Sequence, residues 1–165
     1  MATDVFNKME IVRGHRKDSE KGSNYVTVQS MLSHEIENDM IKPKLKDSTT
    51  GTRNLLRLHR ALEYINAFLE GIPGLETNDK CCPMSQEAYK KTLIKYHPWV
   101  VQKAAMMAMH MLPTKEGLIK KIGDIQDEET LTKATETLNG AVNAMKKVHE
   151  VTQELYSEKD LLNLP

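Results

Sequence analysis

Apolar residues recur at intervals of three and four positions through most of the 165-residue chain. Side chains at this spacing share one face of an α-helix, whereas those of a half-buried β-strand alternate every second residue. No sustained alternation of β-branched residues is present in the sequence. The pattern therefore predicts an all-α fold of about seven helices, joined by short loops and without an internal repeat.

Residues that start and stop helices divide the chain into segments. Gly14 and the charged stretch after it are expected to end the first helix, and Pro43 the second. Thr52 and Ser85 are expected to act as N-caps, and Pro98 fits the first turn of a helix. The segment KPKLKDSTTG reads as a polar loop. The expected helices span approximately residues 3–12, 24–42, 52–70, 85–96 and 98–113, with a short helix from 114 and a long one over 128–157.

The helix over 52–70 carries one apolar stripe, formed by Leu58, Leu62, Ile65 and Leu69. A chain of this length buries about 70% of its unfolded surface, so we expect a single domain over 1–165, built as a helical bundle or sandwich. Ten methionines and only two phenylalanines indicate an interior of flexible, unbranched side chains. This composition is typical of ordinary core filling, and it also suits a pocket for a hydrocarbon chain.

Charge and cysteine content exclude several classes of protein. Lys plus Arg and Asp plus Glu number 23 each, so no net field attracts nucleic acid and any anion site must be local. No apolar run has the roughly 20 residues that span a bilayer, and the first residues lack the apolar core of a secretory signal; we therefore expect a cytoplasmic protein. Cys81 and Cys82 are interpreted as reduced thiols in a short loop, with lipid acylation as the alternative.

Two arginines form the clearest candidate site. Arg53 and Arg57 are four residues apart on the expected long helix, so both guanidinium groups lie on one face. They repel each other, and a shared dianion would satisfy both because guanidinium groups match phosphate oxygens in bidentate geometry. The alternative is a solvated helix face paired with nearby carboxylates.

Four further residues carry weaker signals. Asp4 and Lys8 have the spacing of an ordinary i, i+4 surface ion pair. His97 lies between aromatic residues in YHPW, where its ring can donate to a buried carbonyl or serve as a satisfied core histidine. Trp99 beside it suits either the core or a membrane interface. No nucleophile motif, glycine-rich phosphate loop or spaced metal-ligand set is found, so we expect neither catalysis nor a metal or cofactor.

Three stretches together resemble the glycolipid transfer protein superfamily, and specifically its ceramide-1-phosphate transfer branch. They are RNLLRLHRALEYINAFLEGI, YHPWVVQKAAMMAMHMLPTKE and VTQELYSEKDLLNLP. The resemblance covers almost the whole chain, from about Asp4 to Pro165. It implies a two-layer, all-helical sandwich with a polar headgroup site at the surface and an apolar pocket for the sphingoid and acyl chains.

The resemblance also assigns roles to the candidate residues. Asp4 would accept a hydrogen bond from the ceramide amide, and Lys8, Arg53 and Arg57 would bind the phosphate. His97 would donate to the acyl carbonyl. Trp99 matches a family tryptophan near the membrane-contacting surface. Glycolipid-binding members place a tryptophan where Arg57 stands, so the arginine indicates a phosphate headgroup.

The expected function is therefore non-covalent transfer of ceramide-1-phosphate between membranes by a non-enzymatic, peripherally membrane-associated protein, whose oligomeric state the sequence leaves open. Family members carry a first helix and the start of a second before the Asp–Lys motif, which here almost directly follows Met1. We expect this shortening to expose apolar pocket lining. The alternative function is a lipid-sensing or interaction module that binds headgroups without transferring lipid.

Overall fold

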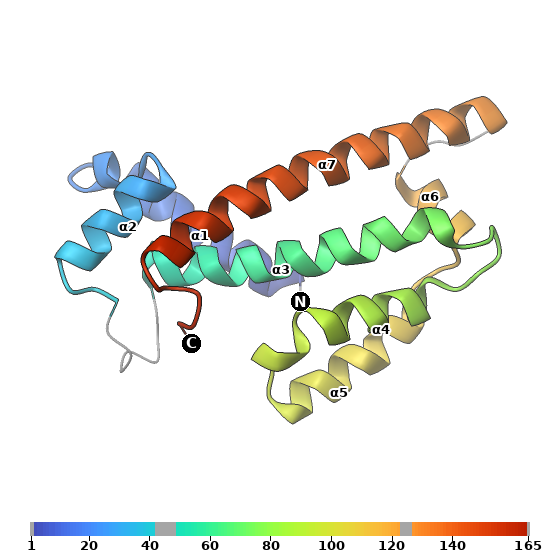
Figure 1. The fold of residues 1–165 in the computed structure, drawn as a ribbon, viewed down its shortest axis with the longest axis horizontal. Coiled ribbons are helices and arrows are strands. Elements are labelled where there is room, and N and C mark those ends of the chain that lie inside the picture. Colours follow the sequence, from blue (N-terminus) through green and yellow to red (C-terminus); the bar gives the residue numbers. More distant parts are fainter. Residues whose placement is uncertain (1, 42–48, 123–126, 165) are drawn as a thin grey trace. The chain divides into compact units, whose positions relative to one another are not determined.

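The computed structural model describes residues 2–41, 49–122 and 127–164, and within these ranges the chain is all-α, as predicted (Figure 1). Strands are absent from the described ranges, apart from an isolated bridge between Lys80 and Thr114. None of the described helices is long and apolar enough to cross a membrane. The α-helices are α1 (Ala2–Lys17), α2 (Val28–Glu37), α3 (Gly51–Gly71), α4 (Cys81–Lys91), α5 (Trp99–Ala108), α6 (Lys115–Ile122) and α7 (Glu128–Glu158); the 3-10 turns are η1 (Gly22–Tyr25), η2 (Ile72–Gly74), η3 (Ile94–Tyr96) and η4 (Met109–Met111).

The chain divides into two compact units. Unit 1 comprises Met1–Arg60 and His149–Pro165, and unit 2 comprises Ala61–Val148. The boundaries fall inside α3 and α7, so each of these helices contributes residues to both units. Each unit has its own apolar cluster, and we describe the two separately.

Unit 1 is built around a cluster in which η1, α2, α3, α7 and the C-terminal segment meet. Its buried members are Tyr25, Met31, Leu32, Leu56, Tyr156 and Leu161. Helix α2 begins with a capping box, since the Thr27 side chain accepts from the Ser30 N–H and the Ser30 side chain accepts from the Thr27 N–H. The Tyr156 hydroxyl donates to the Thr52 carbonyl at 2.7 Å, which ties the end of α7 to the first turn of α3.

The predicted N-cap of the long helix is wrong. Helix α3 begins at Gly51, so Thr52 lies inside the helix. The cap comes from another helix: the buried Glu35 carboxylate of α2 accepts from the Gly51 N–H at 2.7 Å and from the Thr52 N–H at 3.0 Å. Two of the four orphan N–H donors of the first turn are thereby satisfied.

Unit 2 packs the second part of α3 with α4, η3, α5 and η4. Its buried cluster consists of Cys82, Tyr89, Leu93, Ala105 and Met109. The prediction for the start of α4 is also wrong. The helix begins at Cys81, so the two cysteines are free, buried thiols in its first turn rather than loop residues. Ser85 lies inside the helix with its hydroxyl 2.6 Å from that of Tyr64, which explains why a hydroxyl is tolerated there.

The first helix is longer than predicted, since α1 runs through Gly14 to Lys17. A single exposed glycine costs a helix only about 1 kcal/mol, and three basic residues in the last turn favour the negative end of the helix dipole. Helix α2 ends at Glu37, before Pro43. The boundaries expected at Pro98, Thr114 and 128–157 are confirmed to within one residue. Most of the predicted polar loop, residues 42–48, lies outside the described residues.

Candidate functional site

The first turns of α3 carry the two candidate arginines. Arg53 is only 2% exposed and Arg57 is partly buried. Both lie in unit 1, one helical turn apart, as the spacing predicted. A guanidinium group held at such low exposure is costly unless anionic or polar partners surround it. The N-terminal end of α3 therefore holds two guanidinium groups at low exposure, one of them almost fully buried.

Helix α1 carries the other two headgroup candidates of unit 1. Lys8 forms an ion pair with Asp4 one turn away, as their spacing predicted. The two side chains differ in environment, since that of Lys8 is 14% exposed and that of Asp4 is 70% exposed. The ammonium group is thus held against the protein, while the carboxylate faces solvent.

A buried hydrogen-bond network fixes the N-terminal end of α3. The Tyr25 hydroxyl donates to Glu35 Oε1 at 3.0 Å, and the same oxygen accepts from the Gly51 N–H. Burial, followed by the neighbouring Glu35 charge, raises the pKa of Tyr25 well above its ordinary value of 10. The Tyr25 ring stacks on His15 of α1, with centroids 4.6 Å apart. His15 Nε2 in turn hydrogen-bonds with the Thr49 carbonyl.

His97 lies in unit 2, directly before the proline that precedes α5. Its Nδ1 is 2.7 Å from the hydroxyl of Tyr89, and the two rings are tilted with centroids 5.7 Å apart. Tyr89 is fully buried, and burial raises the pKa of its phenol, which keeps the hydroxyl protonated. A hydroxyl that donates to Nδ1 places the imidazole proton on Nε2, the tautomer that can donate to a carbonyl.

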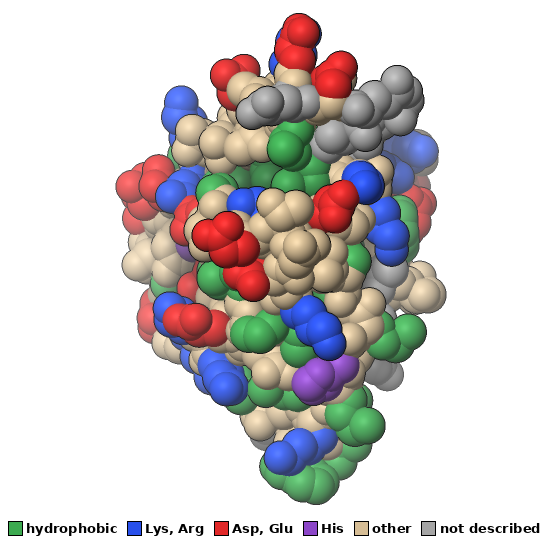
Figure 2. Space-filling view, turned by 90° about the vertical axis from the view of Figure 1, so that its right-hand side faces the viewer, with side chains coloured by type: hydrophobic (Ala, Val, Ile, Leu, Met, Phe, Trp, Pro, Cys, Tyr) green, Lys and Arg blue, Asp and Glu red, His purple; other side chains and the backbone are tan. Residues whose placement is uncertain are grey.

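Trp99 begins an exposed apolar face on α5 and η4. Trp99, Met107 and Met111 follow one another at four- or eight-residue intervals and are 69%, 73% and 88% exposed. Lys103 stands between them, its ammonium nitrogen 5.9 Å from the Trp99 ring centroid. Figure 2 shows hydrophobic side chains with a cationic one among them at its lower end, the level at which α5 lies in Figure 1. An aromatic ring beside a lysine and exposed apolar residues is a composition typical of a membrane-interface surface.

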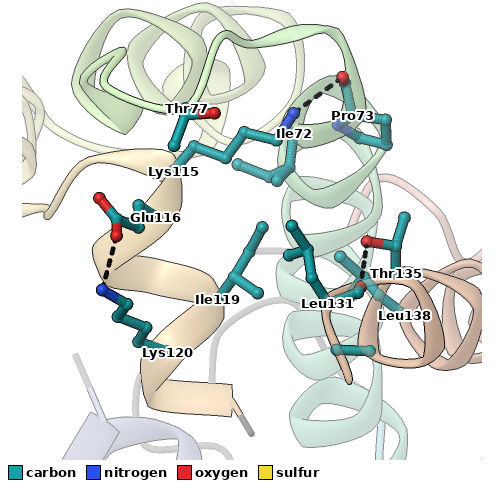
Figure 3. Close-up of a pocket in the computed structure, with 11 residues that line it drawn as sticks. Ile72, Pro73, Thr77, Lys115, Glu116, Ile119, Lys120, Leu131, Thr135 and Leu138 are labelled. Carbon is teal, nitrogen blue, oxygen red and sulfur yellow. Dashed lines mark hydrogen bonds and ion pairs between the residues drawn. The ribbon is translucent and has the colours of Figure 1, made fainter. Parts of the chain in front are cut away.

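Unit 2 also contains a cavity of about 300 Å³ between η2, α6 and α7 (Figure 3). Its apolar lining comes from Ile72, Ile119, Leu131, Ala134 and Leu138. The charged groups at its edge are already bonded, because the Lys115 ammonium donates to the Pro73 carbonyl and Lys120 pairs with Glu116. The volume lies at the lower end of the range for ligand pockets.

The predicted residues are divided between the two units. Asp4 and Lys8 contact each other on α1, and the arginine pair shares the first turns of α3. His97 and Trp99 belong to unit 2. Among the described residues, no group of three or more His, Cys, Asp or Glu could hold a metal ion. Sequence reasoning missed Glu35, although its spacing from Met31 and Leu32 placed a carboxylate on an apolar helix face.

Comparison with known sequences gives consistent relatives. The profile described as glycolipid transfer protein matches residues 1–124. The ceramide-1-phosphate transfer protein of Danio rerio is 34% identical over 167 residues, which cover 100% of this chain and 77% of that protein. The human protein of the same name is 31% identical, with 100% and 76% covered. The chain thus spans about three quarters of the length of these relatives.

Solved structures agree with the sequence matches. The apo form of mouse ceramide-1-phosphate transfer protein superposes with a TM-score of 0.89 at 30% identity, covering 100% of this chain and 78% of that one. The human protein in complex with 12:0 ceramide-1-phosphate gives a TM-score of 0.87 at 32% identity, with 99% and 77% covered. The all-α arrangement, the family profile and these relatives lead to one conclusion: the chain belongs to the glycolipid transfer protein family.

Proposed function

We propose that this protein transfers ceramide-1-phosphate between membranes, holding the headgroup by non-covalent contacts and the hydrocarbon chains in apolar surroundings. The observation that carries the proposal is the arginine pair on the first turns of α3, in a chain similar to a protein solved with ceramide-1-phosphate bound. Both units serve this one activity as a single domain over residues 1–165.

Phosphate recognition is the task of Arg53, Arg57 and Lys8. Guanidinium groups bind phosphate oxygens in bidentate geometry, and the ammonium group adds a point charge. Each charge-assisted contact contributes about 1.5–3 kcal/mol, which is sufficient to select a phosphate over a neutral headgroup. The low exposure of Arg53 and of the Lys8 side chain strengthens these contacts, because solvent screens them less.

The ceramide amide and acyl carbonyl provide two further recognition points. Asp4 accepts from the amide N–H through its solvent-facing carboxylate. His97 donates to the acyl carbonyl through Nε2, in the tautomer that is present when the Tyr89 hydroxyl donates to Nδ1. The resemblance to the family carries both assignments, and His97 lies in a different unit from the other four headgroup residues.

Membrane contact is peripheral and uses the exposed face of α5, led by Trp99. Ile72 of η2 is only 1% exposed and therefore does not belong to the proposed membrane-contacting surface. Burying a CH₂ group contributes about 0.8 kcal/mol both in the membrane and in the protein. The two contributions cancel when the hydrocarbon chains move between them, so transfer needs neither an energy source nor a covalent step. The protein acts as a carrier and not as an enzyme.

The test is transfer of fluorescent ceramide-1-phosphate between vesicles, beside a fluorescent glycolipid. We expect transfer of the phosphate lipid alone, and loss of that transfer in Arg57→Ala. Arg13→Ala, which removes an exposed arginine on α1, is the matched control and should leave transfer unchanged. Headgroup binding without transfer would favour an interaction module instead, and chemically altered lipid recovered after incubation would contradict a carrier function.

A further inference from the structure

Glu35 is a buried, charged side chain to which the family resemblance gives no role. It is 0% exposed on α2 and accepts three hydrogen bonds, from the Tyr25 hydroxyl and from the N–H groups of Gly51 and Thr52. We propose that Glu35 is a positioning residue for phosphate recognition, because its carboxylate holds the turn of α3 from which Arg53 and Arg57 project. This inference rests on the proposed function.

The position of Glu35 decides which groups remain to bind the lipid phosphate. The N-terminal end of a helix binds anions through its free N–H groups. Here the Glu35 carboxylate already occupies the first two N–H groups of α3. These two N–H groups are thus not available to the lipid phosphate, and its affinity depends on where the guanidinium groups stand.

The carboxylate also offsets an unfavourable charge arrangement. Arg53 is the third residue of α3 and is 2% exposed, so a buried positive charge lies at the positive end of the helix dipole. A negative charge bonded to the same turn stabilises this arrangement in the absence of lipid. The arginine can then keep one position before and after the phosphate binds.

The same network extends to the helix that carries Lys8. Tyr25, the third hydrogen-bond partner of Glu35, stacks on His15 of α1, and His15 bonds to the carbonyl of Thr49 just before α3. One carboxylate thus links α1 with α3, the two helices of unit 1 that hold the phosphate-binding groups. The start of α3 is closely packed against α2, since a Cβ added at Gly51 would lie 2.5 Å from the Met31 sulfur.

The decisive variant is Glu35→Gln, which keeps the shape and removes the charge. We expect its affinity for vesicles containing ceramide-1-phosphate to fall about tenfold. Binding to phosphatidylcholine vesicles without this lipid, read from the fluorescence of Trp99, the single tryptophan of the chain, should stay within about twofold. A merely structural role would lower both affinities together. Glu87→Gln, on the exposed face of α4, is the matched control.

A second variant covers the case in which Glu35→Gln does not fold. Glu35→Asp keeps the charge but is one methylene too short to reach both N–H groups, and we expect an intermediate loss of about threefold. Native affinity in a folded variant would overturn the positioning role, and so would equal losses on the two vesicle types. If the native protein does not prefer vesicles with ceramide-1-phosphate, both the proposed function and the role of Glu35 are wrong. If the native protein has this preference and both variants keep it, only the role of Glu35 is wrong.

Discussion

The two units differ in whether they bury charged side chains. Among the described residues, the buried Glu, Asp, Lys and Arg side chains are Glu35, Arg53 and Arg60, and all three belong to unit 1. The buried polar groups of unit 2 are the neutral side chains of Asn66, Ser85 and Thr92. Unit 2 instead exposes a run of large apolar side chains on α5 and η4.

This contrast matches two tasks of the proposed lipid carrier. Buried charges are tolerated only where partners hold them in a fixed geometry, so they mark a preorganised polar site. Exposed apolar side chains carry no such geometric demand and suit contact with a disordered hydrocarbon or headgroup layer. Substitutions in unit 1 should therefore affect stability and headgroup selection, and those on α5 only membrane contact.

The largest effect is expected when the buried carboxylate of unit 1 is removed. Glu35→Ala leaves the Tyr25 hydroxyl and two N–H groups of α3 without their acceptor, which should lower the free energy of unfolding by about 3 kcal/mol. Urea denaturation followed by circular dichroism measures the change. Glu87→Ala on the surface of unit 2 should not shift the midpoint measurably, and an equal shift in both variants would contradict the contrast.

The next largest effect concerns the C-terminal segment of unit 1. Arg60 Nη2 donates to the carbonyls of Leu162 and Leu164, both at 2.8 Å. Arg60→Ala should cost about 2 kcal/mol and raise amide hydrogen exchange at residues 159–164. Exchange at the amides of α5 serves as the internal control; acceleration there as well would mean that the substitution does not act on unit 1 alone.

Alkaline pH should destabilise unit 1. The pKa values of Tyr25 and Tyr156 are raised above 10, chiefly by burial, so the folded state retains phenolic protons that the unfolded chain releases. Their stabilising contribution is complete below pH 10 and declines above it, by about 1.4 kcal/mol per pH unit and per group. Urea midpoints measured between pH 8 and 11 should stay level up to about pH 10 and fall above it, less steeply in Tyr25→Phe. If the urea midpoint of Tyr25→Phe depends on pH as steeply as that of the native protein, Tyr25 is not one of the groups responsible. Tyr96→Phe, at an exposed tyrosine, is the control.

The smallest effect on stability is expected on the exposed face of α5. Trp99→Ala should leave the melting temperature unchanged and weaken sedimentation with vesicles by about tenfold. Phe6→Ala is a matched control, since Phe6 is an aromatic residue of unit 1 with 64% exposure against 69% for Trp99. If both variants lose vesicle binding equally, membrane contact is not confined to unit 2.

Local patterns predicted the helices, but not the starts of α3 and α4. The all-α class and the limits of α7 followed from periodicity, and Pro98 marked the start of α5 because proline is tolerated in the first turn of a helix. Thr52 failed as a cap because a residue sixteen positions before Gly51 takes that role, and no local pattern encodes such a partner. Gly14 was interpreted as a stop, although an exposed glycine weakens a helix too little to end it.

The candidate site was predictable where it depends on spacing within one helix. The ion pair of Asp4 and Lys8 and the one-turn separation of Arg53 and Arg57 follow from 3.6 residues per turn. The low exposure of Arg53 and the contact of His97 with Tyr89 depend on packing between helices, which spacing does not encode. The headgroup roles of these residues remain proposals that the Arg57→Ala experiment begins to test.

The division of the chain also bears on the order in which the protein is made. Unit 2 is one continuous stretch, whereas unit 1 joins an early segment to a late one, with bonds such as that from Tyr156 to Thr52 spanning 104 residues. During synthesis, the arginine-bearing turn of α3 emerges long before the tyrosine that secures it. Unit 2 can acquire its core while the chain is still growing, but unit 1 cannot close until translation reaches the last helix. The headgroup site proposed for unit 1 is therefore expected to form after the core of unit 2.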